Sequence, residues 1–333
     1  NGTFSFVCPE DNSCSDFDHP VGTIPVELSF GGFGYYLPAT YIANYTIWGH
    51  TNITITDSSS IVVAGQNVTF TGFIENDLQI PLDREVTILW DGITRTKVNS
   101  INGDFSGTFV VPSNTIAGNH TLTALINDQN FLRGSSDDTE ILVMRETEVT
   151  LQWLGGFRNS TSVVSGYLRD VVGVGLPEHK LDVYFDDEFV GNVTTGESGI
   201  FAYDLFTDEN TELGTHNVAI VFEGSYLYLS SENEVDSEIL AHTFFTTEPL
   251  EVFRLQEFNL TGYLVDDLGN AMPNQPLNVT FVGATYQLFT DSEGYVTKNI
   301  TLSSNHALGL YTAQWSFNGH GYYLPTSTEQ SIA

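Results

Sequence analysis

The chain has 333 residues, of which 42 are acidic and only 10 are lysine or arginine, so its net charge is −32. A surface this negative repels nucleic acid and anionic membranes, and both are excluded as direct partners. It attracts inorganic cations instead, although adaptation to a saline medium or simple solubility accounts for the same charge equally well.

The first distinctive segment is CPEDNSC, which holds the only two cysteines, Cys8 and Cys14. They lie in a polar stretch, and no further cysteine or suitably spaced histidine is nearby to complete a zinc site. This arrangement predicts a short-loop disulfide between Cys8 and Cys14. The alternative, two free thiols in a reducing compartment, agrees poorly with the glycosylation motifs described below.

A ten-residue pattern occurs four times, ending at Phe30, Ile126, Phe222 and Phe317, which are 96, 96 and 95 residues apart. Each copy begins with an apolar residue and a glycine and then alternates, which is the period of a strand with one buried face. A regular period of this length indicates tandem structural units. The copies are VGTIPVELSF (21–30), AGNHTLTALI (117–126), LGTHNVAIVF (213–222) and LGLYTAQWSF (308–317).

A second marker, Ser/Thr-Gly followed by an aromatic and an aliphatic residue, recurs at 71–74, 165–168 and 261–264. A proline, an alternating run, a polar turn and a further aromatic position follow each copy. Each unit therefore contains roughly seven short runs separated by turns every 8–12 residues, which is typical of an antiparallel β-sandwich. The predicted fold is all-β, with tandem Ig-like sandwich repeats of about 95 residues whose cores are packed with aromatic side chains.

The repeat spacing predicts that the chain begins within a repeat, because only about fifty residues precede the first complete one. The segment SFGGFGYYLPAT (29–40) near this start reappears as SFNGHGYYLPTS (316–327) in the last repeat. Half a sandwich exposes its core and strand edges, so we expect either a longer array or completion by another subunit. The expected domains are the C-terminal strands of an incomplete repeat at 1–52 and full repeats at 53–147, 148–244 and 245–333.

Asn-X-Ser/Thr sequons occur ten times, about twice as often as chance predicts for this composition. Several have the form Asn-(Val/Ile/Leu)-Thr within an expected strand, which points Asn and Thr outward, although threonine-rich strands produce this pattern by alternation alone. We expect N-linked glycans at several sites, which implies an extracellular protein at the cell surface. The acceptors are Asn1, Asn44, Asn52, Asn67, Asn119, Asn159, Asn192, Asn259, Asn278 and Asn299.

Catalytic motifs are absent from the sequence, which has no Gly-X-Ser-X-Gly elbow, HExxH, phosphate loop or CxxC. His120 and His216 occupy the strand position that Ile24 and Tyr311 take in the other copies, so we interpret them as packing residues. No catalytic residue is assigned, and we do not expect an enzyme.

Covalent isopeptide crosslinks, which some extracellular sandwich repeats use, require a lysine at a repeating core position. The only lysines are Lys97, Lys180 and Lys298, and they do not occupy equivalent positions in the repeats. This chemistry is therefore excluded.

An acidic row lies in SSENEVDSEIL (230–240), where Glu232, Glu234, Asp236 and Glu238 alternate with other residues. On a strand, all four side chains project from one face. Such a row is either a solvated edge that resists mispairing or half of a calcium site. Calcium is the secondary hypothesis, because the spacing matches no fixed ligand loop.

With its Ser/Thr-Gly-aromatic marker, later proline and closing Tyr-X-Leu segment, the repeat resembles the Ig-like tandem repeats of archaeal cell-surface and S-layer proteins. The resemblance covers nearly the whole chain, and it implies a glycosylated, acidic array that forms a surface layer or filament by self-assembly. The motifs that carry it are structural.

Three functions remain open at this point. The first is a structural component of a surface layer or surface filament whose acidic exterior attracts cations. The second is a cell-surface adhesin or glycan-binding array, and the third is a set of spacer repeats in a larger secreted enzyme. An adhesin is expected to carry a divergent loop or an exposed aromatic platform in one repeat, whereas the enzyme requires a non-repeating domain elsewhere.

Overall fold

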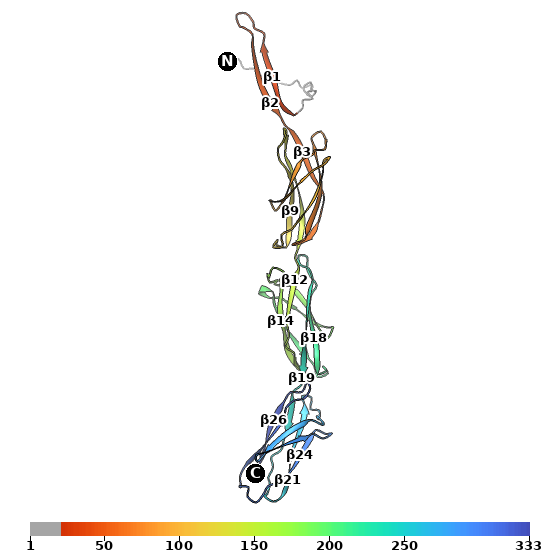
Figure 1. The fold of residues 1–333 in the computed structure, drawn as a ribbon, viewed down its shortest axis with the longest axis vertical. Helices are drawn as coiled ribbons and strands as arrows, with labels where there is room; N and C mark the ends of the chain where they lie inside the picture. Colours follow the sequence, from red (N-terminus) through yellow and green to blue (C-terminus); the bar gives the residue numbers. More distant parts are fainter. Residues whose placement is uncertain (1–20) are drawn as a thin grey trace. The chain divides into compact units, whose positions relative to one another are not determined.

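The structure is a computed structural model that describes residues 21–333 (Figure 1). Over this range the chain is built from strands, with one short 3₁₀ turn at Glu197–Gly199, as the all-β prediction requires. None of its helical turns has the length and apolar character needed to cross a bilayer. Cys8, Cys14 and Asn1 lie outside the described residues, so the predicted disulfide and the first sequon stay predictions.

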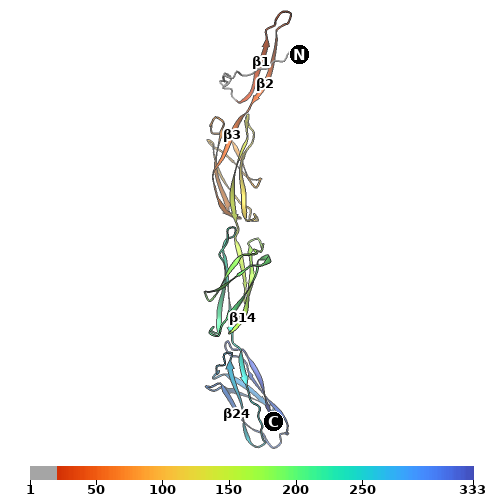
Figure 2. The ribbon, with the colours of Figure 1, turned by 180° about the vertical axis from the view of Figure 1, so that it is seen from behind.

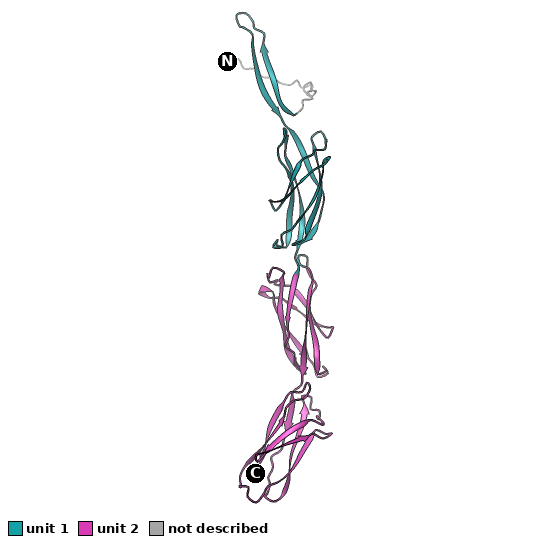
Figure 3. Ribbon diagram, viewed as in Figure 1, with its two compact units in different colours: residues 1–146, 226–228 teal, residues 147–225, 229–333 magenta. Residues whose placement is uncertain are grey.

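The chain divides into two compact units, which Figure 3 colours separately. Unit 1 contains residues 1–146 and 226–228, and unit 2 contains residues 147–225 and 229–333. Unit 1 holds a separate hairpin and the first repeat, whereas unit 2 holds the second and third repeats. The strands that open the three repeats begin at Gly49, Thr147 and Thr243.

The first repeat (49–144) is a sandwich of two sheets. Its strands are β3 (Gly49–Ser58), β4 (Ile61–Val63), β5 (Asn67–Asn76), β6 (Glu85–Trp90), β7 (Ile93–Asn99), β8 (Asp104–Val110), β9 (Gly118–Ile126), β10 (Leu132–Arg133) and β11 (Ser135–Met144). One sheet has the order β10-β3-β5-β8 and the other β4-β11-β9-β6-β7. The opening segment serves both sheets, because β3 pairs with β5 whereas β4 pairs in parallel with β11.

The second repeat (147–240) has the same plan. Its strands are β12 (Thr147–Gln152), β13 (Gly156–Phe157), β14 (Ser160–Asp170), β15 (Lys180–Phe185), β16 (Glu188–Thr194), β17 (Ile200–Thr207), β18 (Gly214–Phe222) and β19 (Ser231–Leu240). They form the sheets β12-β14-β17 and β13-β19-β18-β15-β16. As in the first repeat, the short second strand, β13, pairs in parallel with the last one, β19.

The third repeat (243–332) again contains two sheets. Its strands are β20 (Thr243–Thr246), β21 (Glu257–Asp266), β22 (Pro276–Phe281), β23 (Ala284–Phe289), β24 (Tyr295–Thr301), β25 (Tyr311–Phe317) and β26 (Thr326–Ile332). They form the sheets β20-β21-β24 and β23-β22-β25-β26. A parallel bridge between Leu250 and Ile332 corresponds to the short second strand of the other repeats.

The hairpin of β1 (Gly22–Phe30) and β2 (Ala39–Ile47) precedes the first repeat and forms a two-stranded sheet of its own. Its register, with Ile24 opposite Tyr45, reproduces that of β25 and β26, where Tyr311 is opposite Ile332. Views from opposite sides show no further described strand beside it (Figures 1 and 2). The hairpin therefore has the pairing of the last two strands of a repeat, and the assignment of residues 1–52 to an incomplete repeat stays a prediction.

Alternation along the strands sorts side chains between core and solvent. In β5, Val68, Phe70 and Ile74 are buried, and the threonines between them are exposed. Each repeat also buries a large ring at its centre, Trp90 in the first, Phe201 in the second and Trp315 in the third. Burying a large apolar side chain contributes about 1.5–3 kcal/mol, so the recurring aromatics stabilise the cores.

The Ser/Thr-Gly marker has a steric cause, because its glycine lies beneath an aromatic ring or against a neighbouring strand. A Cβ at Gly72 would overlap the ring of Phe105, and a Cβ at Gly262 would overlap the ring of Phe245. At Gly166 it would overlap the carbonyl oxygen of Thr150. The glycine of the motif therefore leaves room for a neighbouring ring or backbone at the centre of the smaller sheet in every repeat.

A side-chain turn follows this strand in each repeat. The Oδ1 atoms of Asn76, Asp170 and Asp266 each accept hydrogen bonds from the backbone N–H groups two and four residues later. Asx turns of this kind hold a loop in one conformation without further secondary structure. In the third repeat, the turn fixes Asp266 at the end of the sandwich that faces the second repeat.

Gly166→Ala is expected to lower the free energy of unfolding of the second repeat by about 1–3 kcal/mol, because the added methyl group overlaps a neighbouring backbone. Gly196→Ala in the same repeat is the matched control. Its Cβ would meet no atom closer than the oxygen of Ile200 at 3.6 Å, and its φ of −84° suits alanine. Hydrogen exchange of the amides of the second repeat measures both effects, and equal protection in the two variants would contradict the steric explanation.

Candidate functional surfaces

Among the described residues, no second sheet covers the apolar face of the hairpin. The side chains of Ile24, Val26, Leu28 and Phe30 alternate along β1 and share a face with Tyr45 of β2. Phe30 is 50% exposed and Tyr45 56%, whereas their counterparts in the third repeat, Phe317 and Ile332, are 1% and 0% exposed. A sheet face of this composition is stable when a second sheet covers it.

The loop of the hairpin is also exposed, and the third repeat shows what such a loop does. There, the N–H of Leu324 donates to the carbonyl oxygen of Ala241 and the N–H of Ala241 donates to that of Tyr322, each over 2.9 Å. The Tyr-Tyr-Leu-Pro loop thus pairs with the segment that enters its repeat. The matching residues 35–38 have no such segment beside them among the described residues, and Tyr35 and Tyr36 are exposed.

The joint between the second and third repeats is short. β19 ends at Leu240 and β20 begins at Thr243, so only Ala241 and His242 lie between the two sandwiches. Ala241 is fully buried, and the hydroxyl of Thr243 donates to the oxygen of Leu324 over 2.8 Å. The third repeat therefore holds the chain on both sides of His242, whose ring centroid lies 4.4 Å from that of Phe157 in the second repeat.

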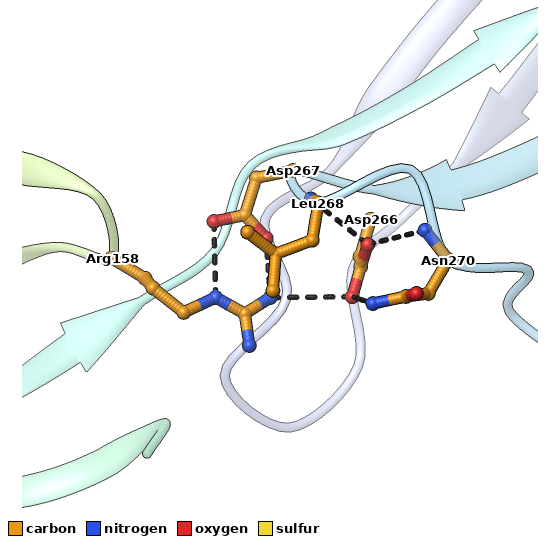
Figure 4. Close-up of polar contacts among 5 residues, drawn as sticks. All are labelled: Arg158, Asp266, Asp267, Leu268 and Asn270. Carbon is orange, nitrogen blue, oxygen red and sulfur yellow. Dashed lines mark hydrogen bonds and ion pairs between the residues drawn. The ribbon is translucent and has the colours of Figure 1, made fainter. Parts of the chain in front are cut away.

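A buried ion pair crosses this joint (Figure 4). Arg158, next to β13 of the second repeat, donates from Nε to Oδ2 of Asp267 over 3.2 Å and from Nη2 to Oδ2 of Asp266 over 3.2 Å. A further hydrogen bond joins Nη2 to Oδ1 of Asp267. The side chains of Arg158, Asp266 and Asp267 are 11%, 7% and 11% exposed. We refer to these three residues as the joint clamp.

The electrostatics of the joint clamp keep the guanidinium charged. The hydrogen bond with Asp267 raises the pKa of Arg158 above its usual value, and burial opposes this effect only in part. Asp266 accepts from Arg158 through Oδ2, while its Oδ1 holds the Asx turn. A buried pair with its remaining lone pairs satisfied in this way fixes geometry, and removing one partner leaves an uncompensated charge.

Arg254 occupies the position in the third repeat that Arg158 has in the second. Each arginine follows a phenylalanine and lies eight residues before the marker glycine of its repeat. Its guanidinium is exposed and donates to the carbonyl oxygens of Ser304 and His306 over 2.8 and 3.1 Å. The repeat thus offers an arginine at the same end of the sandwich, and in the second repeat this arginine contacts the next sandwich. The sequence analysis did not identify the joint clamp, although the recurring Phe-Arg was an available signal for its arginine.

The acidic row lies where the alternation predicts. Glu232, Glu234, Asp236 and Glu238 are exposed along one face of β19, and Asp236 accepts a hydrogen bond from the amide of Asn217 over 2.9 Å. Within residues 21–333, no group of three or more His, Cys, Asp or Glu side chains is arranged to hold a metal ion. Calcium binding by this row therefore stays a prediction, without a preformed ligand set to support it.

The two histidines predicted to pack do so and also make polar contacts. His120 stacks on Trp90 with ring centroids 5.3 Å apart, and His216 stacks on Phe185 at 5.1 Å. One ring nitrogen of each contacts an aspartate, and the other contacts a backbone carbonyl oxygen four residues earlier. At the same position in the third repeat, the hydroxyl of Tyr311 donates to the equivalent oxygen of Ala307. Each side chain therefore closes the same loop within its own repeat.

Nine of the ten sequons lie in the described residues. Their asparagines are exposed except Asn278, which is half-buried on β22 between two neighbouring strands. Asn259 and Asn299 face each other across β21 and β24, and the amide of Asn299 donates to the oxygen of Asn259 over 3.2 Å. Glycan attachment at any of these sites stays a prediction.

Comparison with known proteins places the fold among tandem Ig-like domains. No protein-family model matches the sequence, and no curated protein sequence does. The structure is similar to the D1–D4 ectodomain fragment of ICAM-5, with a TM-score of 0.51, 9% identity and coverage of 85% of this chain and 77% of that one. The I-band fragment I67-I69 from titin gives a TM-score of 0.48, 12% identity and coverage of 84% and 98%. At these identities the likeness establishes the fold alone.

Arg158→Ala is expected to lower the free energy of unfolding by about 3–5 kcal/mol, because it leaves the two carboxylates of the joint clamp buried without a counter-charge. Arg254→Ala is the matched control, with an expected loss of about 1 kcal/mol from its exposed hydrogen bonds. Urea denaturation measures both, and hydrogen exchange at residues 240–243 and 264–270 reports on the joint. Equal effects of the two substitutions would refute a special role for the clamp.

Glycopeptide mass spectrometry of the protein from its native source is expected to find glycans at exposed sequons and none at Asn278. The amide of Asn278 is half-buried in the centre of a sheet, where an attached sugar lacks space. Asn67, exposed at the start of β5, is the positive control within the same Asn-Val-Thr motif. Full occupancy of Asn278, or unmodified peptides at every sequon, would contradict this expectation.

Proposed function

We propose that this protein is a structural extracellular glycoprotein of the cell surface, in which tandem Ig-like repeats form part of a surface layer or filament. Its activity is mechanical and protective, with an acidic exterior that accumulates inorganic cations without a specific site. Catalysis is not part of this proposal, and the array requires no cofactor.

The observation that carries the proposal is the construction of the joint in unit 2. Two sandwiches are connected by two residues, the linker is hydrogen-bonded to the third repeat, and the joint clamp fixes one sandwich against the next. A flexible connector between independent modules needs none of these contacts. The residues that recur in the repeats form cores, turns and the joint, which are structural roles and are expected of a structural component.

Assembly is proposed to occur between copies of the chain through the hairpin. Its apolar face and its exposed Tyr-Tyr-Leu-Pro loop correspond to surfaces that the third repeat covers with β20, β21, β24 and its entering segment. Apolar sheet faces and unpaired strand edges are the features through which separate chains associate. This contact would hold neighbouring molecules in a continuous assembly.

The extracellular location is proposed on the exposed sequons and the acidic composition. Glycans and negative charge both keep a dense surface array solvated, and counterions collect around any assembly of like charges. The ICAM-5 fragment that resembles this chain is itself an ectodomain. Exposed charges are screened within about 8–10 Å at physiological ionic strength, so cation accumulation should weaken as salt rises.

An adhesin is the second candidate, because the exposed Phe189 and the neighbouring Tyr184 pair their rings on the larger sheet of the second repeat. A spacer array within a secreted enzyme is the third. The histidines that could serve in catalysis, His120 and His216, have both ring nitrogens engaged in contacts within their own repeats. Neither histidine is therefore proposed as a catalytic group, and the enzyme hypothesis depends on a non-repeating domain elsewhere.

The 333-residue chain is expected to associate in a concentration-dependent manner, as measured by sedimentation velocity. The double substitution Phe30→Lys and Tyr45→Lys should shift it to monomer, because two charges on the apolar face prevent burial. Leu154→Lys is the control, since Leu154 is exposed in the second repeat and not on the hairpin. A wild-type chain that stays monomeric at high concentration would overturn the assembly proposal.

A further inference from the structure

The outer face of the larger sheet in the second repeat contains a groove of about 560 Å³. Tyr184 of β15 forms one wall, and Ala219 and Val221 of β18 form the floor. The opposite wall is the first part of β19, with Glu232 and Glu234, and Asp187 closes the end near Tyr184.

The strand register explains why the surface is hollow at this point. Tyr184 lies opposite Ala219, and Ala219 lies opposite Glu234, so a small residue separates a large ring from a long carboxylate side chain. Phe189 lies beyond Tyr184 on the neighbouring strand, with ring centroids 5.8 Å apart in a T-shaped arrangement. Phe189 therefore supports the tyrosine ring on the side away from the groove.

Three side chains of the groove, those of Asp187, Glu232 and Glu234, are carboxylates that accept hydrogen bonds and carry negative charge. Within the described residues, no ion pair or side-chain hydrogen bond engages Asp187, Glu232 or Glu234. The amide of Asn233 is occupied, since it donates to the oxygen of Val149 over 2.9 Å. Lys180, the basic side chain on the same strand as Tyr184, is paired with Asp182 over 2.7 Å. The negative charge of these three carboxylates is therefore not neutralised by a neighbouring side chain, and it is available to attract a positively charged ligand.

The other repeats have the corresponding strands but carry different residues at the groove positions. The positions of Tyr184, Ala219 and Glu234 are taken by Leu89, Thr123 and Asp138 in the first repeat and by Thr280, Gln314 and Glu329 in the third. An aromatic ring beside a small residue and a carboxylate is therefore a feature that distinguishes the second repeat from its neighbours. A solvated sheet face needs neither the ring nor the alanine.

We propose that this groove binds the basic side chain of an arginine or lysine presented by a partner protein. The cation would lie over Ala219, with the face of Tyr184 on one side and the carboxylates of Glu232 and Glu234 on the other. A ring and a carboxylate attract a cation by complementary means, through the quadrupole of the ring and through charge-assisted hydrogen bonds. A neutral sugar is a poorer match, because the groove offers acceptors and few free donors.

The test is a titration of the full chain, labelled at alanine and valine methyl groups, with Nα-acetyl-arginine amide. The methyl signals of Ala219 and Val221 are expected to shift and saturate, with a dissociation constant in the millimolar range, of the order of 1 mM, for a single side chain. The neutral analogue Nα-acetyl-citrulline amide has nearly the same shape and should bind at least about tenfold more weakly, because it lacks the charge.

Substitutions taken from the third repeat provide the matched variants. Ala219→Gln fills the groove without changing the charge and should abolish the shift of Val221, and Tyr184→Thr should weaken binding at least about fivefold. Glu329→Gln in the third repeat removes one negative charge outside the groove and should leave the affinity unchanged. Unchanged methyl spectra in the second-repeat core confirm that each variant is folded.

Three results would overturn the proposal. Equal binding of the citrulline analogue would show that charge is not recognised. Equal loss of affinity in Glu329→Gln and Glu234→Gln would show that the arginine probe responds to net charge alone. Retained binding in both Ala219→Gln and Tyr184→Thr would show that the groove is not the site.

Discussion

Each sheet of this protein is apolar on one face, and the whole structure depends on covering that face with a second sheet. Three times along the chain the requirement is met within about 95 residues, with alternating strands that meet around a central ring such as Trp90 or Trp315. Hydrophobic burial of this kind is the main favourable contribution to the stability of small sandwich domains. The hairpin at 22–47 has the same alternation, and among the described residues no second sheet covers it, which is the reason that we propose it as an association surface.

The same constraint explains how the repeats are joined. Once the apolar faces of two sheets are packed together, only the ends of the sandwich are left for contact with the next repeat along the chain. In unit 2, a two-residue linker and the joint clamp lie between the facing ends of the second and third repeats. Taking an arginine and two aspartates out of water is costly, and the cost is offset only when the hydrogen bonds are complete. At Arg158, Nε and Nη2 together donate three hydrogen bonds to the two aspartates, which sets a defined geometry at this joint.

The outward faces, by contrast, are free to diverge because packing does not restrict them. All three repeats have a carboxylate at the position of Glu234. Beside it, the second repeat has an alanine and a tyrosine, the first a threonine and a leucine, and the third a glutamine and a threonine. A structural array and a binding site are compatible in one molecule, since the scaffold occupies the inward positions and recognition uses the outward ones.

The sequence by itself determined the fold class and the repeat period, because period-two alternation and the spacing of glycine, proline and aromatic residues are local signals that each strand carries. It also indicated that His120 and His216 pack and that 230–240 projects its acids from one face. Only the tertiary structure revealed the joint clamp, since Arg158 and Asp267 are more than a hundred residues apart and the recurring Phe-Arg does not indicate which carboxylate the arginine contacts. The groove was likewise invisible in the sequence, because Tyr184, Ala219 and Glu234 become neighbours only when three strands pair in one register.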